Sequence, residues 1–287
     1  MKKKFAHILF IFLLLFVIAC SEEDSEPHNP AINSDDSWVK LENGLELGKF
    51  NHINTSDPME ANIYILRIDP HLYQFILMNA SAIQNGHKLT AKKWCEMYNL
   101  TAAINASMYQ KDHKTSVSLM RTKNHINNSF ISKDKTILAF HPKKAKDPIV
   151  KMIDRECDDF NLWKKRYGTL IQNIRMVSCK RKNVWSQQPE KWSIAAIGID
   201  AKDRVLFIHS PAPYSTHSFI NELLTIPIQI TQAMYVEGGP ETQLFIQSEN
   251  HTFEFSGAHE NELNGNPSTV RPIPNVIGIQ KRTSVLK

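Results

Sequence analysis

The order of hydrophobic and polar residues along the chain predicts many short strands joined by turns. Compact or alternating apolar runs bounded by turn residues indicate strands, because successive side chains of a strand point to opposite faces of a sheet. We expect strands over residues 62–68, 72–78, 101–104, 136–140, 170–177, 193–200, 204–209, 233–237, 244–246, 253–255 and 275–280.

Three segments have helical spacing instead. After the candidate N-cap Thr90, apolar residues recur at i, i+3, i+4 and i+7, which gives one apolar stripe on a helix. These residues are Ala91, Trp94, Cys95 and Tyr98. Further helices are expected over residues 157–167 and after the hydroxyl residues at 214–217, the latter stopping at Pro227.

Strands therefore outnumber helices, and hairpins are frequent. The predicted fold class is α+β, with a single domain over residues 37–287 whose mixed, mostly antiparallel β-sheet is covered by a few helices. About 250 residues are enough for one large domain with a substantial core.

The N-terminal residues indicate where in the cell the protein is located. Residues 1–19 have the pattern of a bacterial lipoprotein signal peptide, with three lysines, an apolar run and a small residue before Cys20. A lipid on Cys20 would anchor the mature chain to a membrane; the alternative is a short transmembrane anchor. Residues 20–36 predict an acidic flexible tether that resembles the surface-export signal of bacterial lipoproteins. We expect a lipid-anchored protein of the bacterial cell envelope, at the outer membrane.

The chain carries a formal net charge of +5, and the part after the acidic tether is more basic than the whole. Basic runs at 143–146, 164–166 and 180–182 are candidates for nucleic-acid contact or for solvated loops that meet anionic envelope material. The second interpretation fits a lipid-anchored protein, so no nucleic-acid partner is expected.

Three cysteines besides Cys20 permit at most one disulfide and one free thiol: Cys95, Cys157 and Cys179. Neither cysteines nor histidines have the paired spacing of a metal site, and the sequence lacks phosphate-binding loops and dinucleotide-binding glycine motifs. We therefore expect no metal and no cofactor.

The best candidate for a catalytic position is the point where an apolar strand is followed directly by an acid and two glycines. Glu237 ends the strand, and Gly238 and Gly239 allow close approach of a ligand or another backbone and permit positive φ. The alternative is an ordinary turn whose acid faces water. Asn105 occupies a similar strand end, where it offers a donor and an acceptor or forms a local turn.

Two further groups of polar residues are candidates for binding. Strand spacing places Asn173 and Arg175 on one face of residues 170–177, close to Gln172. His125 and Asn128 lie in a polar segment that either lines a sugar pocket or decorates the surface.

Five segments in order resemble the phosphodiester glycosidase family, over roughly residues 60–283. They are residues 103–109, 196–207, 214–224, 236–240 and 271–276. The resemblance implies hydrolysis of a bond between an anomeric carbon and a phosphate, on substrates like N-acetylglucosamine 1-phosphodiesters.

The resemblance also implies roles for the candidate residues. Glu237 would act as a base for water or stabilise an oxocarbenium-like state, with Asn105 and Arg175 as catalytic partners. Arg271, with Arg175, would bind phosphate because guanidinium forms a bidentate fork. The other substrate-binding candidates are Gln172, Asn173, Ser193, His125, Asn128, Gly238 and Gly239.

The predicted function is that of a hydrolase that cleaves a sugar 1-phosphodiester or a related glycosidic bond at the cell envelope, with a glycan or sugar phosphate as substrate. A second hypothesis is a non-catalytic glycan-binding surface lipoprotein with the same scaffold. A third, an adhesion or assembly lipoprotein, requires a large exposed apolar patch.

Overall fold

The computed structural model describes residues 38–51, 62–84, 86–257 and 270–283. Within these ranges the strands form two sheets rather than the single sheet expected, and every strand pair is antiparallel. The predicted signal peptide, Cys20 and the tether lie outside the described residues.

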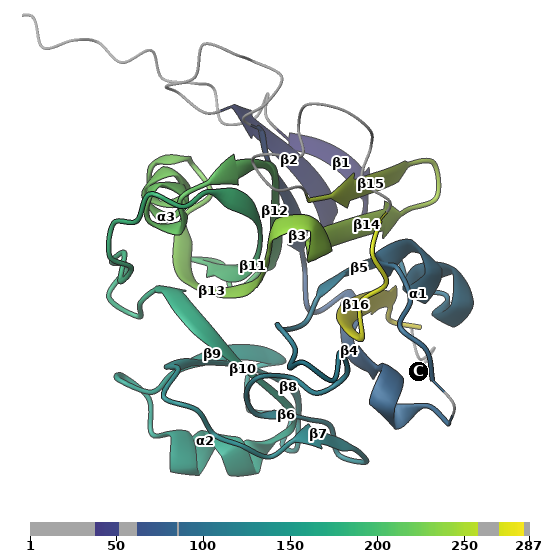
Figure 1. Ribbon diagram of the computed structural model, residues 1–287. Coiled ribbons are helices and arrows are strands. Elements are labelled where there is room, and N and C mark those ends of the chain that lie inside the picture. Colours follow the sequence, from purple (N-terminus) through teal and green to yellow (C-terminus); the bar gives the residue numbers. More distant parts are fainter. Residues whose placement is uncertain (1–37, 52–61, 85, 258–269, 284–287) are drawn as a thin grey trace, which may run out of the picture. The chain divides into compact units, whose positions relative to one another are not determined.

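The larger sheet contains eleven strands (Figure 1). Nine of them follow one another in the order β1 (Trp38–Glu42), β2 (Leu45–Asn51), β3 (Asn62–Ile68), β12 (Val205–Tyr214), β11 (Trp192–Asp200), β13 (Ile230–Gly238), β10 (Tyr167–Val177), β6 (Met120–Arg121) and β7 (Ile126–Asn128). The remaining two extend from β10: β8 (Thr136–Pro142) pairs with β10, and β9 (Val150–Asp154) pairs with β8.

The smaller sheet has five strands (Figure 1). Their order is β15 (Thr252–Ser256), β14 (Gln243–Gln247), β5 (Ala102–Asn105), β16 (Asn275–Lys281) and β4 (Tyr73–Asn79). The chain passes from the larger sheet to the smaller one directly after β13, through the one-turn 3-10 helix η2 (Gly239–Glu241).

The main hydrophobic core lies between the two sheets, because apolar side chains from both meet in one buried cluster. The larger sheet supplies Leu66, Phe207 and Ile197, and the smaller sheet supplies Phe75 and Ile104. Burial of these side chains from both sheets provides the main stabilisation, since each fully buried aliphatic or aromatic side chain contributes about 2 kcal/mol.

Helices cover the outer faces. α1 (Ala91–Tyr98) begins at Thr90, whose hydroxyl accepts the Lys93 N–H, and buries Trp94 against the smaller sheet. α3 (Thr216–Thr225) begins at its cap Ser215 and packs Phe219, Ile220 and Leu223 on the larger sheet. α2 (Phe160–Arg166) and the 3-10 helix η1 (Ala80–Ala82) are shorter. Among the described helices, none is long and apolar enough to cross a membrane.

The predicted mostly antiparallel arrangement is thus confirmed, while strands dominate more than the description α+β implies. The helix expected over 157–167 is shorter than predicted, and residues 126–128 form a strand where the sequence predicted a polar segment. The hairpin of β1 and β2 was not predicted, although its turn contains Gly44 at a φ of +73°.

Candidate functional site

A β-bulge determines the direction of Glu237. Ala196 of β11 pairs with Tyr235 of β13, but the next residue, Ala195, pairs with Glu237, so Val236 is an extra residue in the strand. A bulge shifts the alternation of side chains and often occurs next to active sites. Glu237 therefore shares a face with Ala195, which points into the core between the sheets, whereas Tyr235 packs on the opposite side with Ala196.

The carboxyl group of Glu237 is almost completely buried, with 8% of the residue exposed. Its Oε1 accepts the N–H of Gly238 at 3.1 Å, and among the described residues no cationic side chain forms an ion pair with it. The pKa of Glu237 is raised to about 8, mainly by burial; the Gly238 N–H opposes this shift, and the charge of the nearby Glu241 adds a smaller contribution to it. Near neutral pH this group can therefore donate a proton and take one back.

The two glycines after Glu237 are required for different reasons. A Cβ on Gly238 would overlap the Tyr235 hydroxyl and lie 2.8 Å from Trp192 Cδ1, so only glycine fits between these aromatic residues. Gly239 has a φ of +71°, in the left-handed region that glycine adopts without strain. The positive φ that the sequence predicted thus occurs at Gly239, whereas the close neighbours of Gly238 are side chains rather than the ligand or backbone expected.

Asn105 holds this turn from the end of β5. Its Nδ2 donates to the carbonyl of Glu241 at 2.9 Å, and its Oδ1 accepts the N–H of Gln243 at 2.7 Å. The side chain is buried, and both of its polar atoms bind backbone groups. Asn105 is brought to the site, as predicted, but these contacts fix the backbone between Glu237 and β14.

A charged pair lies at the open side of the turn. Arg271 donates to Glu241 Oε1 at 2.7 Å, with side chains that are 48% and 24% exposed. Burial raises the pKa of Tyr109 to about 12; the charges of Glu241 and Glu237 act in the same direction, and Arg271 opposes the shift. Tyr109 therefore lies within electrostatic reach of all three side chains. Four polar side chains from separate segments thus share one site.

Tyr109 is carried by a small hairpin that follows β5. Tyr109 and Ser116 form an antiparallel bridge, and the Ser107 and Ser116 hydroxyls are 3.0 Å apart. Asn128 donates to the Ser116 carbonyl at 2.7 Å, and Asn275 accepts the Ser107 N–H at 3.0 Å. Asn128 therefore supports the hairpin of the site from behind.

Asn173 and Ser193 also lie close to this region. Asn173 donates to the carbonyl of Ala106 at 2.9 Å, and its Oδ1 has no hydrogen-bond partner among the described residues. Ser193 donates to the Pro211 carbonyl at 2.5 Å. A Cβ on Gly257 would meet both Ser193 and the carbonyl of Gly239, which places Ser193 behind the glycine turn.

Arg175 lies in a different environment from the one predicted. Its guanidinium forms ion pairs with Asp154 at 3.0 Å and Glu156 at 2.8 Å, and Asp154 is buried. Both ion pairs run through Nη1, and the two carboxylates offset the positive charge that was expected to bind phosphate. The structure therefore supports an ion-pair cluster at this position.

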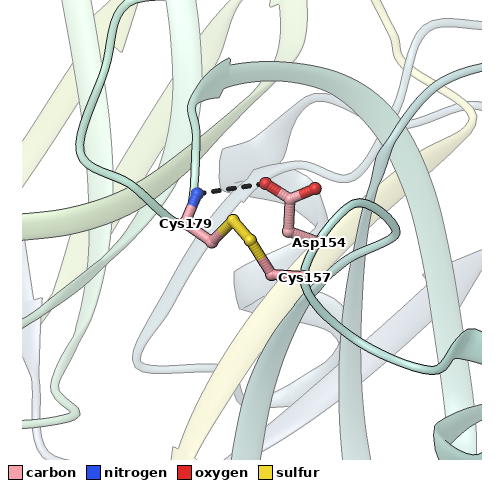
Figure 2. A group of neighbouring side chains, drawn as sticks. All are labelled: Asp154, Cys157 and Cys179. Atoms are coloured by element: carbon pink, nitrogen blue, oxygen red, sulfur yellow. Dashed lines mark hydrogen bonds between the residues drawn. A yellow bond between two sulfur atoms is a disulfide. The ribbon is translucent and has the colours of Figure 1, made fainter.

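The same Asp154 accepts the N–H of Cys179, and Cys179 is joined to Cys157 by a disulfide (Figure 2). Because the two sulfurs are bonded to each other, this group of one acid and two cysteines does not offer the thiolates that a metal ion would require. Cys95 is a buried free thiol. One disulfide and one free thiol is the arrangement that the sequence permitted.

Gln172 and His125 make their polar contacts elsewhere. Gln172 accepts the Ser132 N–H at 3.1 Å and donates to the carbonyl of Asp134 at 2.7 Å, which fixes a loop. The His125 Nε2 is 2.9 Å from the hydroxyl of Ser81. Neither contact involves the residues around Glu237.

Glu241 and Tyr109 belong to the site but were not among the predicted residues. Glu241 follows Glu237 by four positions, just after the glycines, so a pair of acids across a turn was a usable signal. Tyr109 lay inside the segment 103–109 that carried the family resemblance, but a tyrosine in a polar loop has no distinct signal of its own.

Comparison with known proteins identifies the family. Residues 98–280 match the phosphodiester glycosidase family. No curated protein matches the chain in sequence.

The fold resembles the catalytic domain of zebrafish N-acetylglucosamine-1-phosphodiester alpha-N-acetylglucosaminidase, in a form auto-inhibited by its pro-peptide. The TM-score is 0.59, and the sequences are 9% identical over 85% of this chain and 86% of the zebrafish chain. It also resembles a hypothetical protein from Synechocystis, with a TM-score of 0.58 and 12% identity over 85% of this chain and 63% of the other. The chain has the fold of a glycosidase catalytic domain. It belongs to the phosphodiester glycosidase family.

Proposed function

We propose that the protein hydrolyses the bond between the anomeric carbon of a sugar and a phosphate, with an N-acetylglucosamine 1-phosphodiester or a related glycoside as substrate. The observation that carries the proposal is the buried Glu237, whose pKa is raised to about 8, beside the exposed pair of Arg271 and Glu241. The family and the name of the zebrafish enzyme support the same reaction class.

The first step of the proposed mechanism is binding of the phosphate by Arg271. A guanidinium binds phosphate oxygens well, and the half-exposed side chain is accessible to a ligand. Phosphate would compete with Glu241 for the guanidinium and so release that carboxylate. The raised pKa places the hydroxyl of Tyr109 in its neutral form, which can donate a hydrogen bond to the substrate.

In the second step the bond to phosphate breaks. Glu237, protonated near neutral pH, donates its proton to the departing phosphate oxygen. Glu241 accepts a proton from a water molecule whose oxygen bonds to the anomeric carbon. The products are a free sugar and a phosphate monoester, and solvent returns the proton from Glu241 to Glu237.

The role expected for Glu237 from the sequence, that of a base, thus changes to the role of an acid. A carboxyl group buried without a cation holds its proton more tightly, because burial disfavours the charged form. The base is then the more exposed Glu241, whose side chain contacts a cation.

We further propose that the chain is a lipoprotein anchored through Cys20 in the bacterial cell envelope. The lysine-rich start, the apolar run and the small residue before Cys20 support this proposal. Metabolic labelling with an alkyne fatty acid should mark the wild type, and Cys20→Ser should remove the label. A labelled Cys20→Ser chain would contradict the anchor.

Release of free sugar from a panel of sugar 1-phosphodiesters, including the N-acetylglucosamine compound, tests the reaction. The purified full-length protein should release sugar from at least one member, and Glu237→Gln should not. Saturable binding without release by the wild type would instead support a non-catalytic glycan-binding protein.

A further inference from the structure

A cavity of about 500 Å³ is lined by residues of β10 and of the segments 133–135 and 184–188. Its volume falls within the range of roughly 300–1,000 Å³ that is typical of small-molecule sites. The cavity has an apolar wall and a polar rim, formed by Ile174, Val184, Trp185, Gln187, Gln188 and Lys133.

Trp185 connects this cavity to the residues around Glu237. Its ring packs against the ring of Tyr235, with centroids 5.5 Å apart, and the Tyr235 hydroxyl abuts Gly238. The indole N–H donates to the carbonyl of Arg175 at 2.7 Å, which fixes the ring orientation. One aromatic pair therefore separates the cavity from the turn that follows the proposed acid.

Most charged groups around the cavity are paired or hydrogen-bonded, and the lining residues Lys133 and Asp134 carry opposite charges. Arg175 is paired with two carboxylates, and the carboxylate of Asp134 accepts hydrogen bonds from the hydroxyls of Ser118 and Ser132. Lys135 lies 4.0 Å from Glu156. Among the described residues, Lys133 is the lining cation without an ion pair. The cavity thus favours a largely neutral ligand.

The remaining groups match the chemistry of a sugar ring. A pyranose has C–H groups that pack on an indole and hydroxyl groups that hydrogen-bond to primary amides. Val184 and Trp185 supply partly exposed apolar surface, and Gln187 and Gln188 each offer a donor and an acceptor. Aromatic surface with a few polar groups is the usual composition of such sites.

We propose that this cavity is a subsite for a pyranose residue of an oligosaccharide, outside the bond that is cleaved. The inference rests on the proposed function, because it extends the substrate from a single sugar phosphodiester to a glycan that carries such a bond. It assigns glycan recognition to Trp185 and Gln187, on a segment separate from the residues that transfer protons.

Binding can be measured without turnover in the full-length Glu237→Gln protein. Chitohexaose, mannohexaose and maltohexaose serve as probes in isothermal titration, with the corresponding monosaccharides beside them. At least one hexasaccharide should bind at least tenfold more tightly than its monosaccharide. Trp185→Ala and, separately, Gln187→Ala should each weaken that binding at least fivefold.

Trp163→Ala is the matched control, because Trp163 packs on Tyr167 beside α2 and does not line the cavity. It should leave oligosaccharide affinity unchanged. Circular dichroism shows whether each variant is folded, and Gln187→Ala, at an exposed position, keeps the test valid if Trp185→Ala unfolds.

Binding by none of the hexasaccharides, or binding that both cavity variants leave intact, would overturn the subsite. Sugar release from small phosphodiesters by the wild type tests the proposed reaction separately. Oligosaccharide binding that depends on Trp185, in a protein that releases no sugar, would leave the subsite standing and reject the reaction.

Discussion

Glu237 and Arg175 lie on the neighbouring strands β13 and β10, and both are charged residues among hydrophobic neighbours. Glu237 has no cationic partner among the described residues, so burial raises its pKa to about 8. Arg175 is surrounded by Asp154 and Glu156, next to a disulfide. An unpaired buried acid remains available for proton transfer, whereas a cation held by two carboxylates serves the structure.

The largest expected effect is on turnover. Glu237→Gln keeps the shape of the side chain but removes the proton that it transfers, so sugar release should fall by about 10³- to 10⁴-fold, or roughly 4–5 kcal/mol in activation free energy. Steady-state assays on a sugar 1-phosphodiester measure this loss. Residual activity within tenfold of the wild type would remove Glu237 from the reaction.

The next effect is on stability. Arg175→Met leaves the carboxylate of Asp154 buried without its counter-ion, so the free energy of unfolding should fall by about 4 kcal/mol. Urea denaturation measures the change. The double variant Arg175→Met/Asp154→Asn is the control and should recover part of the loss. An Arg175→Met protein that is stable but releases no sugar would contradict the structural role and support a catalytic role for Arg175.

The disulfide should contribute slightly less. Cys157 and Cys179 close a loop with a sequence separation of 22, so replacing both with serine should lower the free energy of unfolding by about 3 kcal/mol. Wild type under reducing conditions should show the same loss. Cys95→Ala under the same conditions is the control for a cysteine outside the disulfide. Equal stability of oxidised and reduced wild type would contradict the prediction.

The smallest effect, counted per pH unit, is the dependence of stability on pH. Between pH 4.5 and 8 the folded protein keeps a proton on Glu237 that the unfolded chain has lost, so rising pH destabilises the fold through this group. The slope should reach at most about 1.4 kcal/mol per pH unit. Subtracting the profile of Glu237→Gln isolates this contribution. Parallel profiles for the two proteins would mean that the carboxyl group titrates normally.

Local patterns were sufficient to predict much of the fold. The cap Thr90 and the apolar spacing after it predicted α1 at the observed residues, and the alternation of Phe253, Glu254 and Phe255 predicted β15. These signals are local. The division into two sheets depends on pairings between strands far apart in sequence, such as β5 with β14, which local patterns do not contain.

The site was predicted only in part, because local patterns do not show which residues far apart in the sequence come into contact. Glu237, Asn105 and Arg271 were placed by strand ends and by the family resemblance, and the structure brings them together. The partners of Arg175 lie about twenty residues before it, at and just after the end of β9, a strand that the sequence analysis did not predict. Spacing on one strand does not reveal such a counter-ion.

The bulge at Val236 makes the direction of Glu237 depend on the length of the strand as well as on its sequence. A regular strand would place Glu237, two residues after Tyr235, on the face of Tyr235. One residue added to β11 opposite Val236 would close the bulge and turn the acid to that face, with every residue of β13 unchanged. Insertions and deletions in β11 and β13 are therefore constrained even where substitutions are tolerated. An alignment of distant relatives, or a transplanted strand, preserves the site only if it keeps the one extra residue of β13 relative to β11.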